Sequence, residues 1–374
     1  MAKTRPSKAS KKTSKTSKPT KTLTAAGSSV SSNPHTPLTT IAPLLAQSRA
    51  LLEASDPSAA LPIASHALTL LPTHLPTLEL LGELHLELAS PEHAYTFFST
   101  AATLDPTGAS SGPEKFLWLA QLAPNGGEEA VRHYSTAVEI LRARLDADDA
   151  EKGYRAKLVS ALCGCAELYM SDLCMEAEAE AMCERFVGEA LLVDSASIEA
   201  LTTLASMRVS QSRTADAVAA VERAWETWRV AGAEEVKVQF PVKVALCRIM
   251  VETGLLEMAV EAVEELQRVD ERLPDLWYLG GWCLFLAGER EKEKGSEGWR
   301  EGWTAARSWL VKCCKVYREE GWEDEGIWEH AQELLKRIKV EVKGEEPEEG
   351  ESEAEEDEMS EEEWESDEED AVMA

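Results

Sequence analysis

Cysteine and histidine are the residue types in this sequence that could hold a metal ion or carry redox chemistry. The chain has eight cysteines and seven histidines, and Cys163, Cys165, Cys174 and Cys183 lie closest together. Residues two apart on a helix point about 200° apart, so Cys163 and Cys165 could share a metal ion only if the helix were broken there. The histidines are scattered and form no HExxH motif. We therefore expect no metal and no cofactor, and we expect these cysteines to be small buried core residues.

Motifs for catalysis are missing as well. Gly126-Gly127 and Gly280-Gly281 lack the strand–loop–helix context of a phosphate-binding loop. No set of serine, histidine and aspartate can be singled out as a nucleophile with its base. The sequence therefore predicts a protein that is not an enzyme.

Carboxylates offer a different chemistry, which is the binding of cationic side chains. Glu79, Glu83 and Glu87 recur at every fourth position and would form one stripe along a helix. Two interpretations stay open, a solvated helix face or an acidic ridge that binds lysine and arginine. Later segments with helical spacing add carboxylates that could extend the ridge and aromatic rings that could make cation–π contacts. These residues are Glu167, Glu199, Glu252, Asp275, Tyr278, Trp282 and Phe285.

The chain as a whole is acidic. Its 374 residues include 38 Lys and Arg and 68 Asp and Glu, which gives a formal net charge of −30. This charge disfavours direct binding to nucleic-acid phosphates and favours a basic protein partner. Hydrophobic residues make up 44% of the chain, which is enough for a folded core. No run of about 20 apolar residues is present that could span a membrane.

Residues 1–40 form a basic segment rich in Ser, Thr and Pro. The first 21 residues hold eight basic side chains and no acid, a composition that cannot bury a core. We predict a disordered arm, which is either a solubilising tail or a nuclear import signal for an import receptor. The lysines of the import hypothesis are Lys8, Lys11, Lys12, Lys15 and Lys18.

Residues 341–374 form an acidic segment. Eighteen acids and no base lie between positions 345 and 370, so we predict a disordered, solvated tail. The tail is either a solubility device or a shield for a highly basic client, with its one tryptophan as a docking residue. The contact residues of the second hypothesis are Glu361, Glu362, Glu363, Trp364 and Glu365. Candidate sites for acid-directed kinases, each with Glu three residues on, are Ser352, Ser360 and Ser366.

The elements that must position the middle carboxylates are helices in a repeat. Residues 79–89 and 92–104 have helical apolar spacing, and the second of these segments carries Ala94, Phe98 and Ala101 on one face. Pro72 and Pro106, which end successive units, are 34 residues apart. With Leu81-Gly82 in the first helix and a small–aromatic–small trio in the second, the pattern resembles the tetratricopeptide repeat.

This resemblance implies an all-α, tetratricopeptide-repeat-like superhelical solenoid over residues 41–340. We expect about seven helix pairs and a C-terminal capping helix over residues 324–340. We also expect a Gly- and charge-rich insertion at 288–302, so that the last second helix begins near Ala306. In this family the first helices line a concave groove that binds extended peptides, and the carboxylates and aromatics named above would line it.

The layout of basic arm, helical array and acidic tail with Glu363-Trp364-Glu365 resembles the fungal assembly chaperones of large-subunit ribosomal protein four. The resemblance implies a monomeric chaperone of the cytoplasm and nucleus. Such a chaperone binds the basic internal loop of its newly made client, shields it, and escorts the client to the nuclear pre-60S particle. The alternative is a nuclear tetratricopeptide scaffold or adaptor that binds histones or another basic protein.

Overall fold

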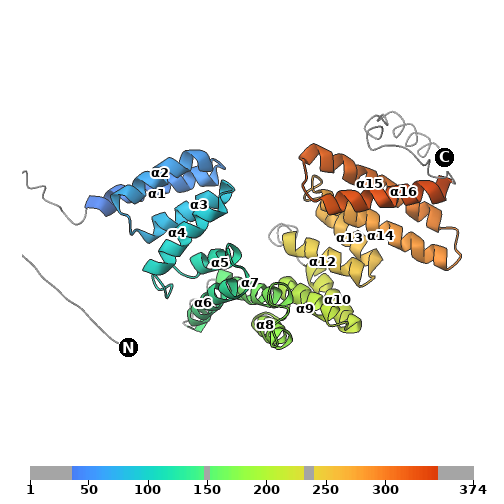
Figure 1. The fold of residues 1–374 in the computed structure, drawn as a ribbon, viewed down its shortest axis with the longest axis horizontal. Helices are drawn as coiled ribbons and strands as arrows, with labels where there is room; N and C mark the ends of the chain where they lie inside the picture. Colours follow the sequence, from blue (N-terminus) through green and yellow to red (C-terminus); the bar gives the residue numbers. More distant parts are fainter. Residues whose placement is uncertain (1–35, 147–151, 231–239, 344–374) are drawn as a thin grey trace, which may run out of the picture. The chain divides into compact units, whose positions relative to one another are not determined.

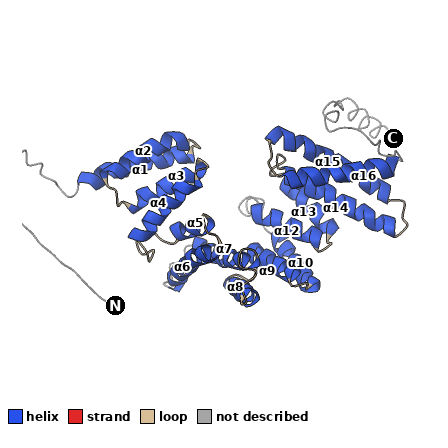
Figure 2. Ribbon diagram, in the orientation of Figure 1, coloured by secondary structure: helices blue, strands red, loops and turns tan. Residues whose placement is uncertain are grey.

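The computed structural model describes residues 36–146, 152–230 and 240–343 (Figure 1). Within these residues there are 15 helices and no strand (Figure 2). The helices form seven consecutive pairs followed by a single helix, which confirms the predicted helical array. The chain divides into two compact units with the boundary between Pro72 and Thr73. In the described residues no helix is both long and apolar enough to span a membrane.

The first unit contains one helix pair, α1 (Thr36–Glu53) and α2 (Pro57–Leu70). α2 begins at a proline and is capped by Asp56, whose carboxylate accepts a hydrogen bond of 3.0 Å from Ala59 N. Its inner face consists of Ala60, Ala64 and Ala67, each 0% exposed, so α1 can approach closely. The helical array begins at Thr36, five residues before the predicted position, and the arm lysines lie outside the described residues.

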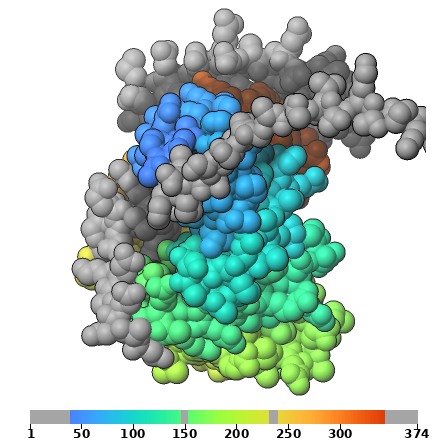
Figure 3. Space-filling model, turned by 90° about the vertical axis from the view of Figure 1, so that its left-hand side faces the viewer, coloured from blue at the N-terminus to red at the C-terminus, as the bar shows by residue number. Residues whose placement is uncertain are grey.

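The second unit contains the remaining helices. They are α3 (Leu75–Glu87), α4 (Pro91–Leu104), α5 (Glu114–Gln121), α6 (Gly127–Asp146), α7 (Lys152–Met170), α8 (Ala179–Val193), α9 (Ile198–Ser210), α10 (Thr214–Val230), α12 (Phe240–Glu252), α13 (Leu256–Gln267), α14 (Pro274–Glu293), α15 (Trp299–Glu320) and α16 (Glu325–Lys343). The helices of each pair pack against each other, and α3 to α8, coloured cyan to green, form a continuous packed surface (Figure 3). First helices also contact first helices, α7 with α9, α9 with α12 and α12 with α14. Residues on these first helices are therefore brought together.

Small residues set the spacing within a pair. A Cβ on Gly82 of α3 would lie 2.5 Å from the Phe98 ring of α4, so only glycine fits there. Ala94, Phe98 and Ala101 are at most 1% exposed. The small–aromatic–small trio predicted from the sequence thus forms the contact between the two helices.

The predicted insertion at 288–302 is wrong. α14 continues to Glu293 and α15 already begins at Trp299, so only residues 294–298 separate the two helices. The two helices pack closely in this region: a Cβ on Gly288 of α14 would lie 2.4 Å from the Trp303 ring of α15. Trp303 is fully buried and its indole N–H donates to Phe285 O at 3.0 Å. The charged residues around Gly288 continue the helix because they occupy its exposed side.

The last helix, α16, covers the end of the array. Ala331, Leu334 and Ile338 are at most 5% exposed and pack with residues of α14 and α15. This confirms the predicted capping helix, which ends at Lys343. The acidic residues of the tail lie outside the described part of the chain.

Replacing Gly280 by alanine should lower the free energy of unfolding by about 1–3 kcal/mol, because the new methyl group would overpack the pair α14–α15. Its Cβ would lie 2.1 Å from the Trp309 ring. Gly188→Ala in α8 is the matched control, since nothing lies within 4 Å of its Cβ. The control should stabilise the protein by about 0.5–1 kcal/mol. Denaturant unfolding followed by circular dichroism measures both, and a Gly280→Ala protein as stable as the wild type would contradict this packing.

Candidate partner-binding site

The stripe of Glu79, Glu83 and Glu87 lies on α3, as its spacing predicts. The opposite side of the helix is apolar, with Leu80, Leu81 and Leu84 at most 1% exposed. Burial of the leucines turns the carboxylates outward. Glu87 is exposed, whereas Glu79 and Glu83 are partly buried.

Glu79 belongs to an internal network of charges. Its carboxylate accepts a hydrogen bond of 2.5 Å from Ser111 Oγ and lies 3.9 Å from Lys115 Nζ. Lys115 is 0% exposed and donates to Asp105 Oδ2 at 2.9 Å, to Ser111 Oγ at 3.0 Å and to Gly112 O at 3.0 Å. All three hydrogens of the buried ammonium group therefore have acceptors, as a buried charge requires. Glu79 therefore helps to hold α3 to the loop before α5.

The network shifts two carboxyl groups in opposite directions. Burial raises the pKa of Glu79, although Ser111 and Lys115 oppose the shift. Burial acts in the same direction on Asp105, but hydrogen bonds from Lys115 and from two backbone N–H groups hold its pKa below the usual range. Sequence reasoning missed Lys115. The available signal was its position four residues before Leu119, which is 1% exposed, so both side chains lie on the inner face of α5.

Glu167 of α7 and Glu199 of α9 are brought together by the contact between these first helices. Ser160 Oγ, also on α7, donates to Glu199 at 2.6 Å. Burial raises the pKa of both carboxyl groups, and the charge of Glu199 raises that of Glu167 further. Glu167 nevertheless reaches solvent. Among the described residues, neither carboxylate forms an ion pair with a lysine or arginine. Glu167 is an exposed residue, so a cationic partner could reach this point and would relieve the repulsion between the two carboxylates.

Two of the predicted groove residues are not available to a partner. Asp275 is 6% exposed and forms an ion pair with Arg248 of α12, so its charge is already compensated. Phe285 is 1% exposed and stacks on Trp303 with the ring centres 4.7 Å apart. The structure thus gives both residues partners inside the protein, which the spacing along a single helix face could not reveal.

The other residues predicted at this end differ in exposure. Glu252 is exposed at the end of α12. Tyr278 and Trp282 are partly buried and meet His330 of α16: the Tyr278 hydroxyl is hydrogen-bonded to His330 Nδ1 at 2.6 Å, and the Trp282 ring centre lies 5.5 Å from that of His330. Burial raises the pKa of Tyr278 to about 12. The capping helix α16 thus contacts both aromatic rings through His330.

The cysteines are core residues with one exception. All eight are free thiols, seven are buried, and Cys174 is exposed. Burial raises the pKa of Cys165 to about 12, which keeps this thiol protonated. In the described ranges no group of three or more His, Cys, Asp or Glu is placed to hold a metal ion. The tail residues Glu361 to Glu365, Trp364 among them, lie outside those ranges.

Comparison with known proteins decides the family. No family profile matches the chain. A protein of Emericella nidulans described as a probable assembly chaperone of rpl4 is 36% identical over 327 residues, which cover 82% of this chain and 83% of the relative. The chain therefore belongs to the family of rpl4 assembly chaperones. A second member, from Schizosaccharomyces pombe, is 35% identical over 285 residues, which cover 74% of this chain and 84% of that protein.

Solved structures agree with the family. The structure of the assembly chaperone of RpL4 (Acl4), residues 1–338, matches with a TM-score of 0.62 and 32% identity. The match covers 68% of this chain and 99% of the Acl4 chain. A tetratricopeptide repeat protein from Parabacteroides merdae shares the fold alone, with a TM-score of 0.50 and 16% identity over 80% of this chain and 99% of that one. The predicted tetratricopeptide-like fold and the predicted family are both confirmed.

Replacing Glu167 by glutamine should raise the melting temperature at pH 7, because it removes a charge that repels Glu199. The rise should be small, on the order of 1 °C, because the side chain reaches solvent. A carboxyl group with a raised pKa favours folding below its unfolded pKa and loses that contribution as pH rises through the folded pKa. The advantage of glutamine should therefore vanish at about pH 4. Scanning calorimetry at both pH values measures this effect. Glu252→Gln on α12 is the exposed control, and an equal gain from both substitutions would contradict the account.

Proposed function

We propose that this chain is a dedicated ribosome-assembly chaperone. It binds and shields a basic extension of newly made rpl4 and escorts this client to the nuclear pre-60S particle. The observation that carries the proposal is the match to two curated proteins and one solved structure whose names each specify an assembly chaperone of rpl4. The matches cover most of the chain, so the helical array that would hold the client is included.

Electrostatics supports a basic client. A ribosomal protein segment that will contact rRNA is rich in Lys and Arg, and before assembly it has no rRNA phosphates to neutralise it. The net charge of −30 attracts such a segment and increases its association rate. Glu167 and Glu199 supply two uncompensated carboxylates on adjacent first helices, where a lysine or arginine of the client would fit.

The finer points extend this proposal. The client segment is the internal loop of rpl4, bound by one copy of this chain across the first-helix surface. The acidic tail, including Trp364, shields further basic residues of the client, and the arm with Lys8 to Lys18 engages an import receptor. The chain then acts in both cytoplasm and nucleus, and it acts by binding rather than by catalysis.

Affinity capture of the full chain at moderate salt, followed by mass spectrometry, tests the proposal. Capture of rpl4 as the dominant partner is the expected result. Capture of histones or other chromatin proteins without rpl4 would favour the nuclear adaptor instead. The charge-neutral variant Glu167→Gln/Glu199→Gln should capture less rpl4 than the wild type, while Glu222→Gln/Glu226→Gln, which changes two exposed residues of α10, should capture as much.

Binding of purified rpl4 should weaken strongly as salt increases, because counter-ions screen attraction between exposed charges. We expect a loss of about tenfold or more in affinity between about 50 and 500 mM salt. Fluorescence anisotropy with labelled rpl4 measures the dissociation constants. An affinity that does not change over this range would rule out electrostatic recognition.

A further inference from the structure

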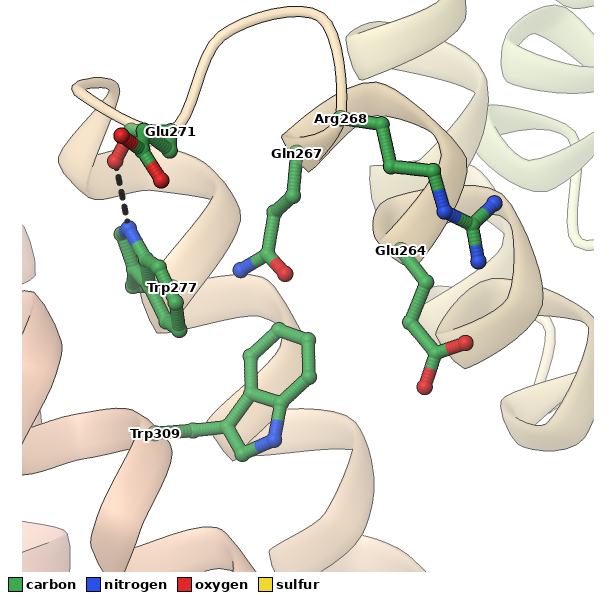
Figure 4. Close-up of a pocket in the computed structure, with 6 residues that line it drawn as sticks. All are labelled: Glu264, Gln267, Arg268, Glu271, Trp277 and Trp309. Atoms are coloured by element: carbon green, nitrogen blue, oxygen red, sulfur yellow. Dashed lines mark hydrogen bonds between the residues drawn. The ribbon is translucent and has the colours of Figure 1, made fainter.

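Trp277 and Trp309 line an open cleft on helices other than α7 and α9, which carry Glu167 and Glu199. The cleft has a volume of about 450 Å³ and is formed by the C-terminal part of α13, the first turn of α14 and the middle of α15 (Figure 4). The two indole rings are 5.3 Å apart and tilted by 55°. Both tryptophans are partly exposed, unlike the fully buried Trp303 of the same region.

The cleft is held in shape by contacts inside the protein. Trp277 Nε1 donates to Glu271 O at 2.7 Å, which fixes the plane of this ring (Figure 4). Trp309 rests on Gly280, where no larger residue would leave room for it. Gln267 points towards the two rings (Figure 4), and its amide nitrogen is buried without a hydrogen-bond partner among the described residues. The cleft thus presents the partly exposed faces of two aromatic rings.

A row of carboxylates on α13 leads to this cleft. Residues 256–271 contain six acids and one base, Arg268. Glu257, Glu261 and Glu264 are exposed and lie on one face of α13, at spacings of four and three residues. Glu264 and Glu271 also line the cleft, while the guanidinium group of Arg268 points away from both indoles (Figure 4).

We propose that this cleft is a second docking site for a basic segment of the protein client, with an arginine or lysine side chain against the solvent-facing side of the Trp277–Trp309 ring pair. The proposal deepens the chaperone function and rests on it. The carboxylates of Glu257, Glu261 and Glu264 on α13 favour a basic segment by charge complementarity. Tryptophan is the best aromatic partner for a cation. Lys312 Nζ already lies 5.7 Å from the centre of the Trp277 ring, so this ring accepts a cation in the free protein. A client chain that binds both at Glu167 and Glu199 and at this cleft would bind more tightly than at either site alone.

Carbodiimide cross-linking of the full chain tests the site, because it joins client lysines directly to nearby carboxylates. Two probes are used, purified rpl4 and a synthetic peptide of alternating glycine, arginine and lysine. With either probe, Glu264 and Glu271 should be cross-linked about two- to fivefold more than Glu222 and Glu226, two exposed residues of α10. Trp277→Leu should remove this excess and leave cross-links at other carboxylates unchanged, which also reports that the variant is folded.

Equal cross-linking at the cleft and at the α10 control would overturn the inference, as would an excess that survives Trp277→Leu. These results are separate from a failure of the chaperone function itself. Absence of any binding between the wild-type chain and rpl4 would end the chaperone proposal, while the peptide would still decide whether the cleft takes a basic segment.

Discussion

Close approach of paired helices is the constraint on which the rest of this structure depends. No pair of helices buries enough apolar surface alone, so each must fit tightly within the pair and against the next. The Phe98 ring packs against Gly82, and the Trp309 ring packs against Gly280. Neither contact leaves space for a Cβ atom on the glycine. Because these contacts set the spacing, the first helices α7, α9, α12 and α14 follow one another in contact.

Charge is the second constraint, and it is resolved differently inside and outside. Lys115 is buried and every hydrogen of its ammonium group has an acceptor. Glu167 and Glu199 form no ion pair with a described lysine or arginine, and burial raises the pKa of both. The hydrogen bonds of Lys115 stabilise the fold. The repulsion between Glu167 and Glu199 instead costs stability, and it provides affinity for a cation. The same residues that would bind a basic client are therefore those whose neutralisation should strengthen the fold.

The repeat could be predicted from the sequence because small residues and prolines recur at a fixed period. The family followed from the combination of array and charged ends. What could not be predicted depends on contacts between helices distant in sequence. Arg248 of α12 forms an ion pair with Asp275 of α14, and Trp303 of α15 stacks on Phe285 of α14. The same Trp303 packs against Gly288, in a segment rich in glycine and charge that is helical nonetheless. The spacing along a single helix contains no information about these partners.

Hydrogen–deuterium exchange of the full chain with and without rpl4 tests most directly whether the first helices recognise the client. The account predicts slower exchange in α3, α7 and α9 on addition of rpl4, centred on the segments that carry Glu83, Glu167 and Glu199. Protection confined to second helices such as α4, α8 and α10, with no change in the first helices, would contradict it.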